Sequence, residues 1–477
     1  MLKKSEILDF IEQDKSDERK RQAKEGERYY EGEHDIKNYK LYYYNGDGEL
    51  TEDKTRSNIK ISHPFFTELV DQQVQYMLSG KEGFAFSDDT ELQKILDEYF
   101  NNNEDFKAEL FDVVTDTISK GSGYLYVYKN KYDKLTFQSA NSLGVIEVRA
   151  NDTDDKCEYV IYWYIDRIEK GRKKIKRIQV WNDKETWYYV QEEDGNLIKD
   201  KDAEFNPRPH TIYGVGDEHL YQESFGFIPF FRLDNNKKRL SDLHRVKALI
   251  DDYDLMSCGL SNNLQDIAEG IYVVTGFEGD NLDELIENVK VKKHIGVQEG
   301  GSLDIKTINI PYDARKVKLE EDEKNIYRFG MGLDSARVGD GNITNVVIKS
   351  RYSLLDLKSN KLEIRLKQFL RKLIDVVLDE VNEKEGTDYQ SKDVRLEFTR
   401  EIITNASDNA GIELTDAQRK QVEINTILSL ASVLDHDTIV QKICDVLDVD
   451  YEEIKDKLPQ QEVMELGEDE QMAEAGS

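Results

Sequence analysis

Cysteine and proline are scarce in this chain of 477 residues, which has three cysteines and six prolines. Cys157, Cys258 and Cys444 are too few and too scattered for a disulfide framework or a zinc site, so we expect a reducing compartment. No linker rich in proline, glycine or serine divides the chain. The roughly two to four domains expected from its length should therefore be inserted into one another rather than joined in a row.

The chain also lacks the motifs of membrane spans and of common enzyme classes. No apolar run reaches the roughly 20 residues of a transmembrane helix, and the charged N-terminus does not resemble a signal peptide. The patterns GxSxG, HExxH and GxxxxGK followed by Ser or Thr are absent, and the histidines are scattered. We therefore expect no enzymatic activity, no cofactor and no metal ion.

Acidic residues outnumber basic ones, with 97 Asp and Glu against 66 Lys and Arg and a net charge of −31. This balance excludes a protein that grips nucleic-acid phosphates over its whole surface, because such binding needs many Lys and Arg contacts. It is compatible with a protein that encloses DNA without gripping it. Charge alone fits an ordinary acidic, soluble cytosolic protein better.

Two runs of carboxylates leave a metal-dependent nuclease as an alternative. They are Glu320-Glu321-Asp322-Glu323 and Glu468-Asp469-Glu470. A two-metal site needs carboxylates that converge on ions about 4 Å apart. Consecutive acids on a helix point in different directions, so a solvated acidic face explains these runs better.

The first half of the sequence combines helices with a long β-rich part, which predicts an α+β fold. Apolar spacing and capping residues predict helices at 5–31, 66–77, 89–100 and 104–119. Between 124 and 233 the apolar period changes to two, in runs such as YLYVY and EYVIYWYI that are typical of strands. Gly195 and Asn196 are the expected tip of one hairpin.

A split helical hairpin occupies the middle of the chain. Residues 237–270 repeat apolar side chains at alternating steps of three and four, which predicts an amphipathic rod of roughly 50 Å. A small β-rich insert follows at 271–311, and a second helix returns at 312–331. Later elements are predicted as a long helix at 349–384, a strand at 393–400 and short helices within 415–458.

Three stretches carry short motifs in a characteristic order. RYYEGEHDI contains Tyr29, Tyr30, Gly32, His34, Asp35 and Ile36; the stretch from Asn58 to Lys81 contains Val70, Asp71, Gln72, Tyr76 and Gly80. The third, from 226 to 274, contains Ile-Pro, Asn-Asn and Leu-Ile-Asp-x-Tyr-Asp. Together they resemble the portal, or head–tail connector, proteins of tailed double-stranded-DNA bacteriophages with long non-contractile tails from Gram-positive hosts. Glu82 departs from that pattern, which usually has proline there.

The resemblance implies a ring-forming portal fold with a β-rich wing, a long helical stem, a small α/β clip, a long wing helix and a helical crown. Its expected parts are the wing at 1–236, stem helices at 237–270 and 312–331, the clip at 271–311, the tunnel loop at 332–348, the long wing helix at 349–390, the crown at 391–458 and a tail at 459–477. The tail is acidic, and we expect it to be disordered.

The implied function is that of a ring, expected to be a dodecamer, at one capsid vertex. It would conduct double-stranded DNA during packaging and ejection. The implied partners are the terminase large subunit, the head–tail adaptor, the major capsid protein and the scaffolding protein, with no membrane. The implied location is the virion, with assembly in the host cytoplasm, for a phage or a prophage. Another structural protein of the virion head or connector is the alternative.

The resemblance also implies three groups of site residues. The tunnel loop facing DNA would comprise Val338, Gly339, Asp340, Gly341, Asn342, Ile343, Thr344, Asn345 and Val346. The channel wall of the stem would comprise Glu320, Glu321, Asp322, Glu323, Lys324 and Arg328. Docking of terminase or adaptor at the clip would involve Asp280, Asn281, Asp283, Glu284, Glu287 and Lys290.

The tunnel-loop assignment predicts the effect of replacing both Gly339 and Gly341 with proline. Glycine permits the positive φ values that a mobile loop visits, and proline does not. The double variant should still form rings by native mass spectrometry but should package DNA poorly. A normal phage yield from this variant would contradict the assignment.

Overall fold

The structure is a computed structural model that describes most of the chain. The described residues are 1–130, 133–149, 157–169, 173–192, 195–215, 219–267, 271–277, 295–306, 311–334, 345–400, 406–430, 434, 436–447 and 451. The chain divides into two compact units. One comprises Met1–Gly339 and Ser350–Ile402, and the other comprises Asp340–Lys349 and Ile403–Ser477.

Two helices, rather than the single one predicted at 5–31, open the first unit. α1 (Lys4–Ser16) and α2 (Glu18–Tyr30) are separated at Asp17, whose backbone is extended. The Asp17 carboxylate accepts a hydrogen bond from the backbone N–H of Arg19 at 2.8 Å. Because an aspartate in this position caps a new helix, the predicted helix is interrupted there.

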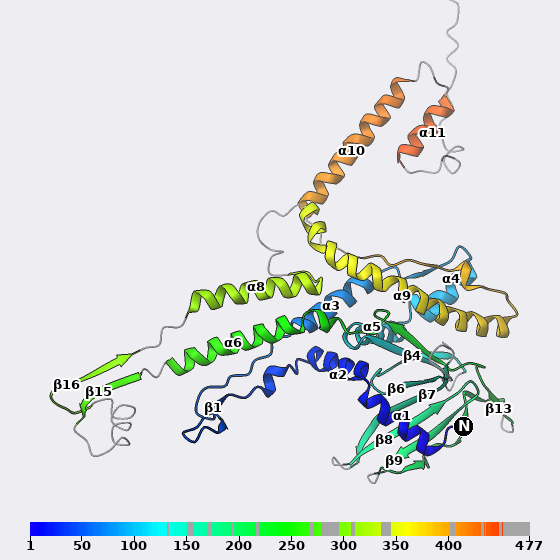
Figure 1. Ribbon diagram of the computed structural model, residues 1–477. Coiled ribbons are helices and arrows are strands. Elements are labelled where there is room, and N and C mark those ends of the chain that lie inside the picture. The colour runs from blue at the N-terminus through cyan, green and yellow to red at the C-terminus, as the bar shows by residue number, and fades with distance from the viewer. Residues whose placement is uncertain are drawn as a thin grey trace, which may run out of the picture. The chain divides into compact units, whose positions relative to one another are not determined.

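A helical layer contributes most of the main core of this unit (Figure 1). α3 (Phe65–Leu78) and α5 (Glu104–Lys120) confirm two predicted helices, and α4 (Thr90–Leu96) continues into a π-helical turn, Asp97–Asn101. α9 (Asn345–Glu385) begins earlier than residue 349. Its apolar residues at steps of three and four are buried: Leu362, Leu366, Phe369, Leu373, Val377 and Val381.

Two antiparallel sheets follow α5, and Gly121 makes the transition with a φ of 95°. A Cβ at this glycine would lie 2.1 Å from the Arg239 carbonyl oxygen, so no other residue fits without movement. One sheet has the order β14-β4-β5, formed by Phe230–Asp234, Ser122–Lys129 and Leu135–Ala140. The other has the order β10-β9-β8-β7-β6, with β11 (Arg208–Pro209) beside β9.

The larger sheet packs on α1 and forms a second core. Its strands are β6 (Val145–Arg149), β7 (Cys157–Glu169), β8 (Lys173–Trp181), β9 (Glu185–Gln191) and β10 (Leu197–Lys199). Ile7 and Ile11 of α1 are buried in the cluster that includes Ile161 and Ile178 of this sheet. The β9–β10 hairpin turns at Gly195, which has a φ of 86°, as the sequence predicts.

The first unit also contains pairs of short antiparallel strands. They are β1 (Tyr42–Tyr44) with β2 (Leu50–Glu52), β12 (Thr211–Val215) with β13 (His219–Glu223), β15 (Ile271–Phe277) with β16 (Val297–Lys306), and β17 (Arg395–Leu396) with β3 (Ala85–Phe86). The strand predicted at 393–400 is thus only two residues long. Through β17, residues 391–402 belong to the first unit, although the expected crown begins at 391.

The described helices of the second unit are α10 (Ala406–Ser429) and α11 (His436–Leu447). α10 begins well before the predicted start at 415. Ile439 and Cys444 of α11 are buried, so its apolar stripe is a packing face.

Because one face of α9 is buried in the core, shortening a side chain on that face should lower the stability of the protein. Leu366 is fully buried, so Leu366→Ala should lower the free energy of unfolding of the unassembled chain by about 2–5 kcal/mol through the cavity it leaves. Ile364 lies two positions away and is 63% exposed, so Ile364→Ala is the matched control and should cost less than about 1 kcal/mol. Urea unfolding followed by circular dichroism measures both values. Equal losses would contradict the assigned core face.

Candidate functional site

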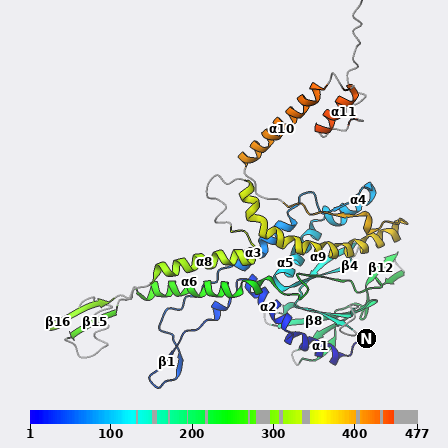
Figure 2. The same cartoon turned by 45° about the horizontal axis from the view of Figure 1, so that its top comes forward.

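α6 (Lys247–Ile267) and α8 (Tyr312–Gly330) are the two arms of the split hairpin and lie side by side in both views (Figures 1 and 2). A 3-10 turn, Asp242–Arg245, precedes α6, so this helix begins later than the predicted residue 237. The chain after α8 closes tightly on α3. A Cβ on Gly332 would lie 2.2 Å from a methyl carbon of Leu69, so the hairpin is fixed to the core at this end.

An ion-pair network joins α6 to α8 along the hairpin. Lys318 Nζ lies 2.6 Å from Asp252 Oδ2 on α6 and also contacts Asp322, one turn further along α8. Hydrogen bonds to Asp252 and Asp322 raise the pKa of Lys318. Asp322 is only 2% exposed, whereas the side chains of Lys318 and Asp252 are 39% and 44% exposed, so the network joins the two helices at the edge of their contact.

Residues 57–63 form an extended segment that lies alongside α6. We call this segment the strap. The backbone N–H groups of residues 57, 59, 61 and 63 donate to the side chains of Asp266, Asn262, Cys258 and Asp254, over 3.2, 2.6, 3.2 and 3.0 Å. Two residues of extended chain advance about 6.6 Å and four residues of helix about 6.0 Å, so the two repeats stay in step. Every fourth side chain of α6 therefore holds alternate residues of the strap.

Asp254 joins two histidines where the strap meets α3. Its Oδ2 lies 2.6 Å from His34 Nδ1, and its Oδ1 lies 2.7 Å from His63 Nδ1. Asp254 and His34 are fully buried, and the His34 ring stacks on Tyr29 with centroids 4.5 Å apart. We call these residues the junction cluster. One carboxylate thus links α6 to the RYYEGEHDI motif and to the strap.

Charged side chains surround the junction cluster. Lys247 Nζ lies 2.7 Å from oxygens of both Asp35 and Asp251, and Arg28 contacts Asp35 at 2.6 Å. Burial by itself raises the pKa of Asp35, but hydrogen bonds from Lys247 and Arg28 outweigh it and lower the pKa to about 2. Burial likewise raises the pKa of Asp254, and its hydrogen bonds with the two histidines bring the pKa below its usual value. Both carboxylates are therefore ionised at neutral pH.

The predicted channel-wall residues of α8 do not share one environment. The exposed ones are Glu320, Glu321, Lys324 and Arg328, and Glu323 is half-buried. Asp322 differs, because it is buried and bound to Lys318. Consecutive acids of this run therefore point in different directions, as expected for a helix, and do not converge on one point.

Comparison with known proteins accounts for this architecture. The family described as phage portal protein, SPP1 Gp6-like, matches residues 9–473. The chain belongs to this family. The portal protein of Bacillus phage SPP1 is 27% identical over 390 residues, which cover 80% of this chain and 75% of that protein. The portal protein of Clostridium phage phiCD119 is 29% identical over 402 residues, which cover 78% of this chain and 84% of that protein.

Family membership confirms the predicted portal fold and gives the chain a phage portal function. Portal proteins are structural components of the virion at the capsid. The family implies a ring-forming oligomer. The α6–α8 hairpin lies within the ranges predicted for the stem, and the junction cluster joins α6 to residues of the predicted wing. The assignments of stem and wing stay predictions.

The predicted tunnel loop lies largely outside the described residues. This holds for Val338, Gly339, Asp340, Gly341, Asn342, Ile343 and Thr344. Asn345 and Val346 lie in the first turn of α9, so this end of the predicted loop is helical. The clip residues Asp280, Asn281, Asp283, Glu284, Glu287 and Lys290 also lie outside the described residues.

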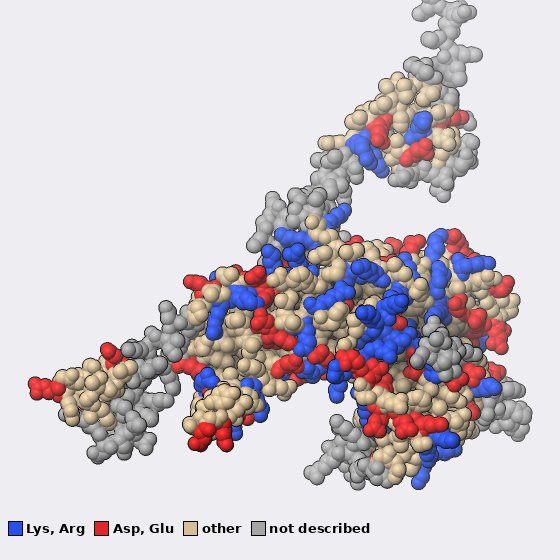
Figure 3. All heavy atoms as spheres, viewed as in Figure 1, with Lys and Arg blue, Asp and Glu red and all other residues tan. Residues whose placement is uncertain are grey.

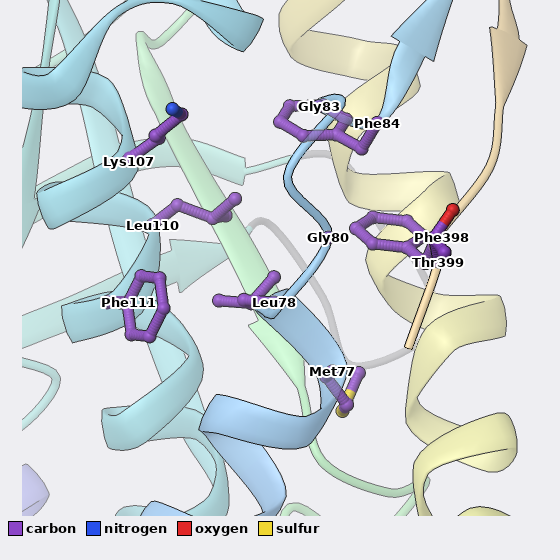
Figure 4. A pocket seen from close by; sticks show the side chains of 10 residues that line it. All are labelled: Met77, Leu78, Gly80, Gly83, Phe84, Lys107, Leu110, Phe111, Phe398 and Thr399. Atoms are coloured by element: carbon purple, nitrogen blue, oxygen red, sulfur yellow. The ribbon is translucent and has the colours of Figure 1, made fainter. Parts of the chain in front are cut away.

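One hollow of the described part of the portal protein is lined mainly by apolar side chains. Figure 4 shows a hollow of about 120 Å³ into which apolar side chains of α3 and α5 project. Lys107 is the one titratable side chain among its ten lining residues, and Lys107 Nζ pairs with Glu104 at 2.9 Å. Among the described residues, no three His, Cys, Asp or Glu side chains are placed to hold a metal ion, and no helix is long and apolar enough to cross a bilayer.

The strap and the junction cluster are not predicted from the sequence. The RYYEGEHDI motif contains His34 but does not reveal its contact with a residue 220 positions later. A signal for the strap does exist in the chain. Asp254, Cys258, Asn262 and Asp266 recur every four residues on α6, which marks a polar face along a helix that also has an apolar one.

The junction cluster predicts a pH-dependent effect of Asp254→Asn. The asparagine side chain has one acceptor oxygen, so it cannot accept hydrogen bonds from both imidazoles and from the backbone N–H of the strap. The free energy of unfolding at pH 7 should therefore fall by about 1–3 kcal/mol. The folded-state pKa of Asp254 is depressed, so its contribution is present above its usual pKa near 4 and is lost as the pH falls through the folded value. The advantage of the wild type should therefore shrink below about pH 4.

Thermal unfolding at neutral and acidic pH measures this difference. Asp313→Asn, at an exposed position of α8, is the matched control and should leave stability unchanged at either pH. A difference between wild type and Asp254→Asn that stays constant with pH would contradict an ionised Asp254 in the folded protein.

Proposed function

We propose that copies of this chain close into a ring of twelve at one capsid vertex and that double-stranded DNA passes along its axis. The observation that carries the proposal is the family match over residues 9–473. The stem supports it, because Val317 and Phe329 of α8 are 62% and 50% exposed in a single copy. Neighbouring copies would cover such apolar side chains. The ring would assemble in the host cytoplasm before it becomes part of the virion.

We assign the exposed residues of α8 to the channel wall. Glu320 and Glu321 lie on the same helix as Lys324 and Arg328, so carboxylates interrupt the row of cations. Each cation that contacts a phosphate adds salt-dependent affinity, and a continuous row would hold the duplex in place. A wall of mixed sign would leave DNA free to move. Asp322 is not part of this assignment, because Lys318 already neutralises it inside the stem.

We assign docking of the terminase large subunit, and later of the head–tail adaptor, to the clip. Its described part is the β15–β16 hairpin, on which Val273 and Leu303 are exposed. A two-stranded hairpin is marginally stable alone in water, so clips of adjacent copies would complete each other. The predicted docking residues between the two strands stay predictions. The wing sheets would contact the capsid and scaffolding proteins.

Native mass spectrometry and end-on electron-microscope images of the purified chain test the ring. We expect particles of several hundred kilodaltons with a central hole. A stable monomer under every condition that supports capsid assembly would overturn the proposal.

The wall assignment predicts the effect of replacing Glu320 and Glu321 with lysine. Twelve copies would then present a basic ring, so binding of a short duplex should strengthen and become more salt-dependent, while DNA packaging should slow. Glu12→Lys with Glu204→Lys gives the same change in charge at exposed positions of the wing and should alter neither. Fluorescence anisotropy at about 50 and 200 mM salt measures binding. Identical behaviour of the two double variants would count against the assignment.

A further inference from the structure

α9 has a second face in addition to the one that packs in the core. Leu354, Leu357, Lys361, Ile364 and Gln368 are exposed at steps of three and four residues along this helix, and we call them the α9 seam. The apolar members are 40%, 49% and 63% exposed at positions 354, 357 and 364. Apolar residues at this spacing are typical of a face that packs against protein.

A basic hollow of about 470 Å³ adjoins the α9 seam. Its charged lining residues are Arg245, Lys358, Lys361, Arg365 and Asp242. The one carboxylate among them is already neutralised, because Asp242 Oδ2 lies 2.9 Å from Lys358 Nζ. The amide side chains of Gln73, Asn235, Asn236 and Gln368 also face this hollow. The hollow therefore has a surplus of positive charge.

Three cations of the hollow are left without an acidic partner in the described part of the chain. Arg245, Lys361 and Arg365 make no ion pair there, although Arg245 contacts the Met331 sulfur at 3.6 Å. Two cations near the hollow are paired: Lys367 lies 2.8 Å from Glu363, and Arg400 contacts Asp356 and Glu363. Figure 3 shows Lys and Arg side chains gathered over the middle of α9.

The chemistry of this surface favours a protein partner over nucleic acid. Phosphates would neutralise the cations of the hollow, but they offer nothing to the apolar side chains of the α9 seam. A protein surface with carboxylates beside apolar groups matches both. The chain itself supplies such surfaces, because its acidic residues exceed its basic ones by 31 and the β1–β2 hairpin exposes Tyr44 and Leu50 near the exposed Asp47 and Glu49.

We propose that the α9 seam and its basic hollow dock an acidic, partly apolar surface of a second copy of this chain. The inference rests on the proposed ring and names one of its contact surfaces. A closed ring of more than two copies joins two different surfaces of each chain, so a basic patch on one copy must meet an acidic patch on the next. Strongly acidic copies otherwise repel one another, and this surface offsets that repulsion where the copies meet.

Charge reversal tests the surface. The variant Arg245→Glu, Lys361→Glu, Arg365→Glu should lose the ring in native mass spectrometry while keeping the circular dichroism and melting temperature of the unassembled wild type. Lys358 is left unchanged because it is buried with Asp242. Lys4→Glu, Lys184→Glu, Lys199→Glu makes the same change in charge at exposed wing positions and should assemble normally. Ile364→Asp should weaken assembly, because it places a carboxylate on the α9 seam, at a position that also lines the hollow.

Normal rings from both the triple variant and Ile364→Asp would overturn the inference and leave the proposed ring intact. If the wild type itself forms no ring, the proposed function fails, and this inference fails with it. Rings from the triple variant that have lost wild-type binding of a short DNA duplex would show instead that the hollow binds nucleic acid.

Photo-crosslinking gives an independent test that does not require a variant to disassemble. A benzophenone side chain at position 364 of the full-length chain, in rings mixed from isotopically light and heavy copies, should link light to heavy chains. The linked peptide should be acidic and should lie outside α9. Crosslinks confined to one copy, or links from α9 to α9, would contradict the inference.

Discussion

Asp254 is the contact on which the relation of stem to wing depends. A buried carboxylate is costly unless donors satisfy it, and here two imidazoles and a backbone N–H do so. The donors come from two places in the sequence, the RYYEGEHDI motif and the strap, and the accepting carboxylate comes from α6. Hydrogen bonds inside the protein therefore tie α6 to residues 34 and 63. Lys247, Asp35 and Asp251 extend the same constraint towards the surface.

The stem is stabilised differently along its length. Near the wing it is held by packing, where Gly332 approaches Leu69 and Tyr327 donates to Glu68 at 2.6 Å. Further out, Lys318 bridges Asp252 and Asp322, and the strap follows one face of α6. These polar contacts leave Val317 uncovered in a single copy. A rod that is rigid by itself but incompletely buried is suited to a ring, where neighbours supply the remaining burial.

The distribution of charge over the chain also affects how copies can associate. A chain with a net charge of −31 resists association with itself, so the sites of contact need local cations. The hollow beside α9 gathers four cations and one carboxylate, so the positive charges are not spread evenly. Under the proposed function, the acidic surface elsewhere would leave DNA free to move, and the basic hollow would receive a neighbour.

The sequence by itself determined the α+β fold, the split hairpin and the core face of α9, because these depend on local periodicity. Its motifs also indicated the portal family. Periodicity does not report sharp local caps, so Asp17, the short β17 and the late start of α6 differed from the predicted ranges. The partners of Asp254, the inward position of Asp322 and the hollow beside α9 were decided only by the tertiary structure. Each depends on which segments, far apart in the sequence, pack together in the fold. The local pattern of residues does not specify that packing.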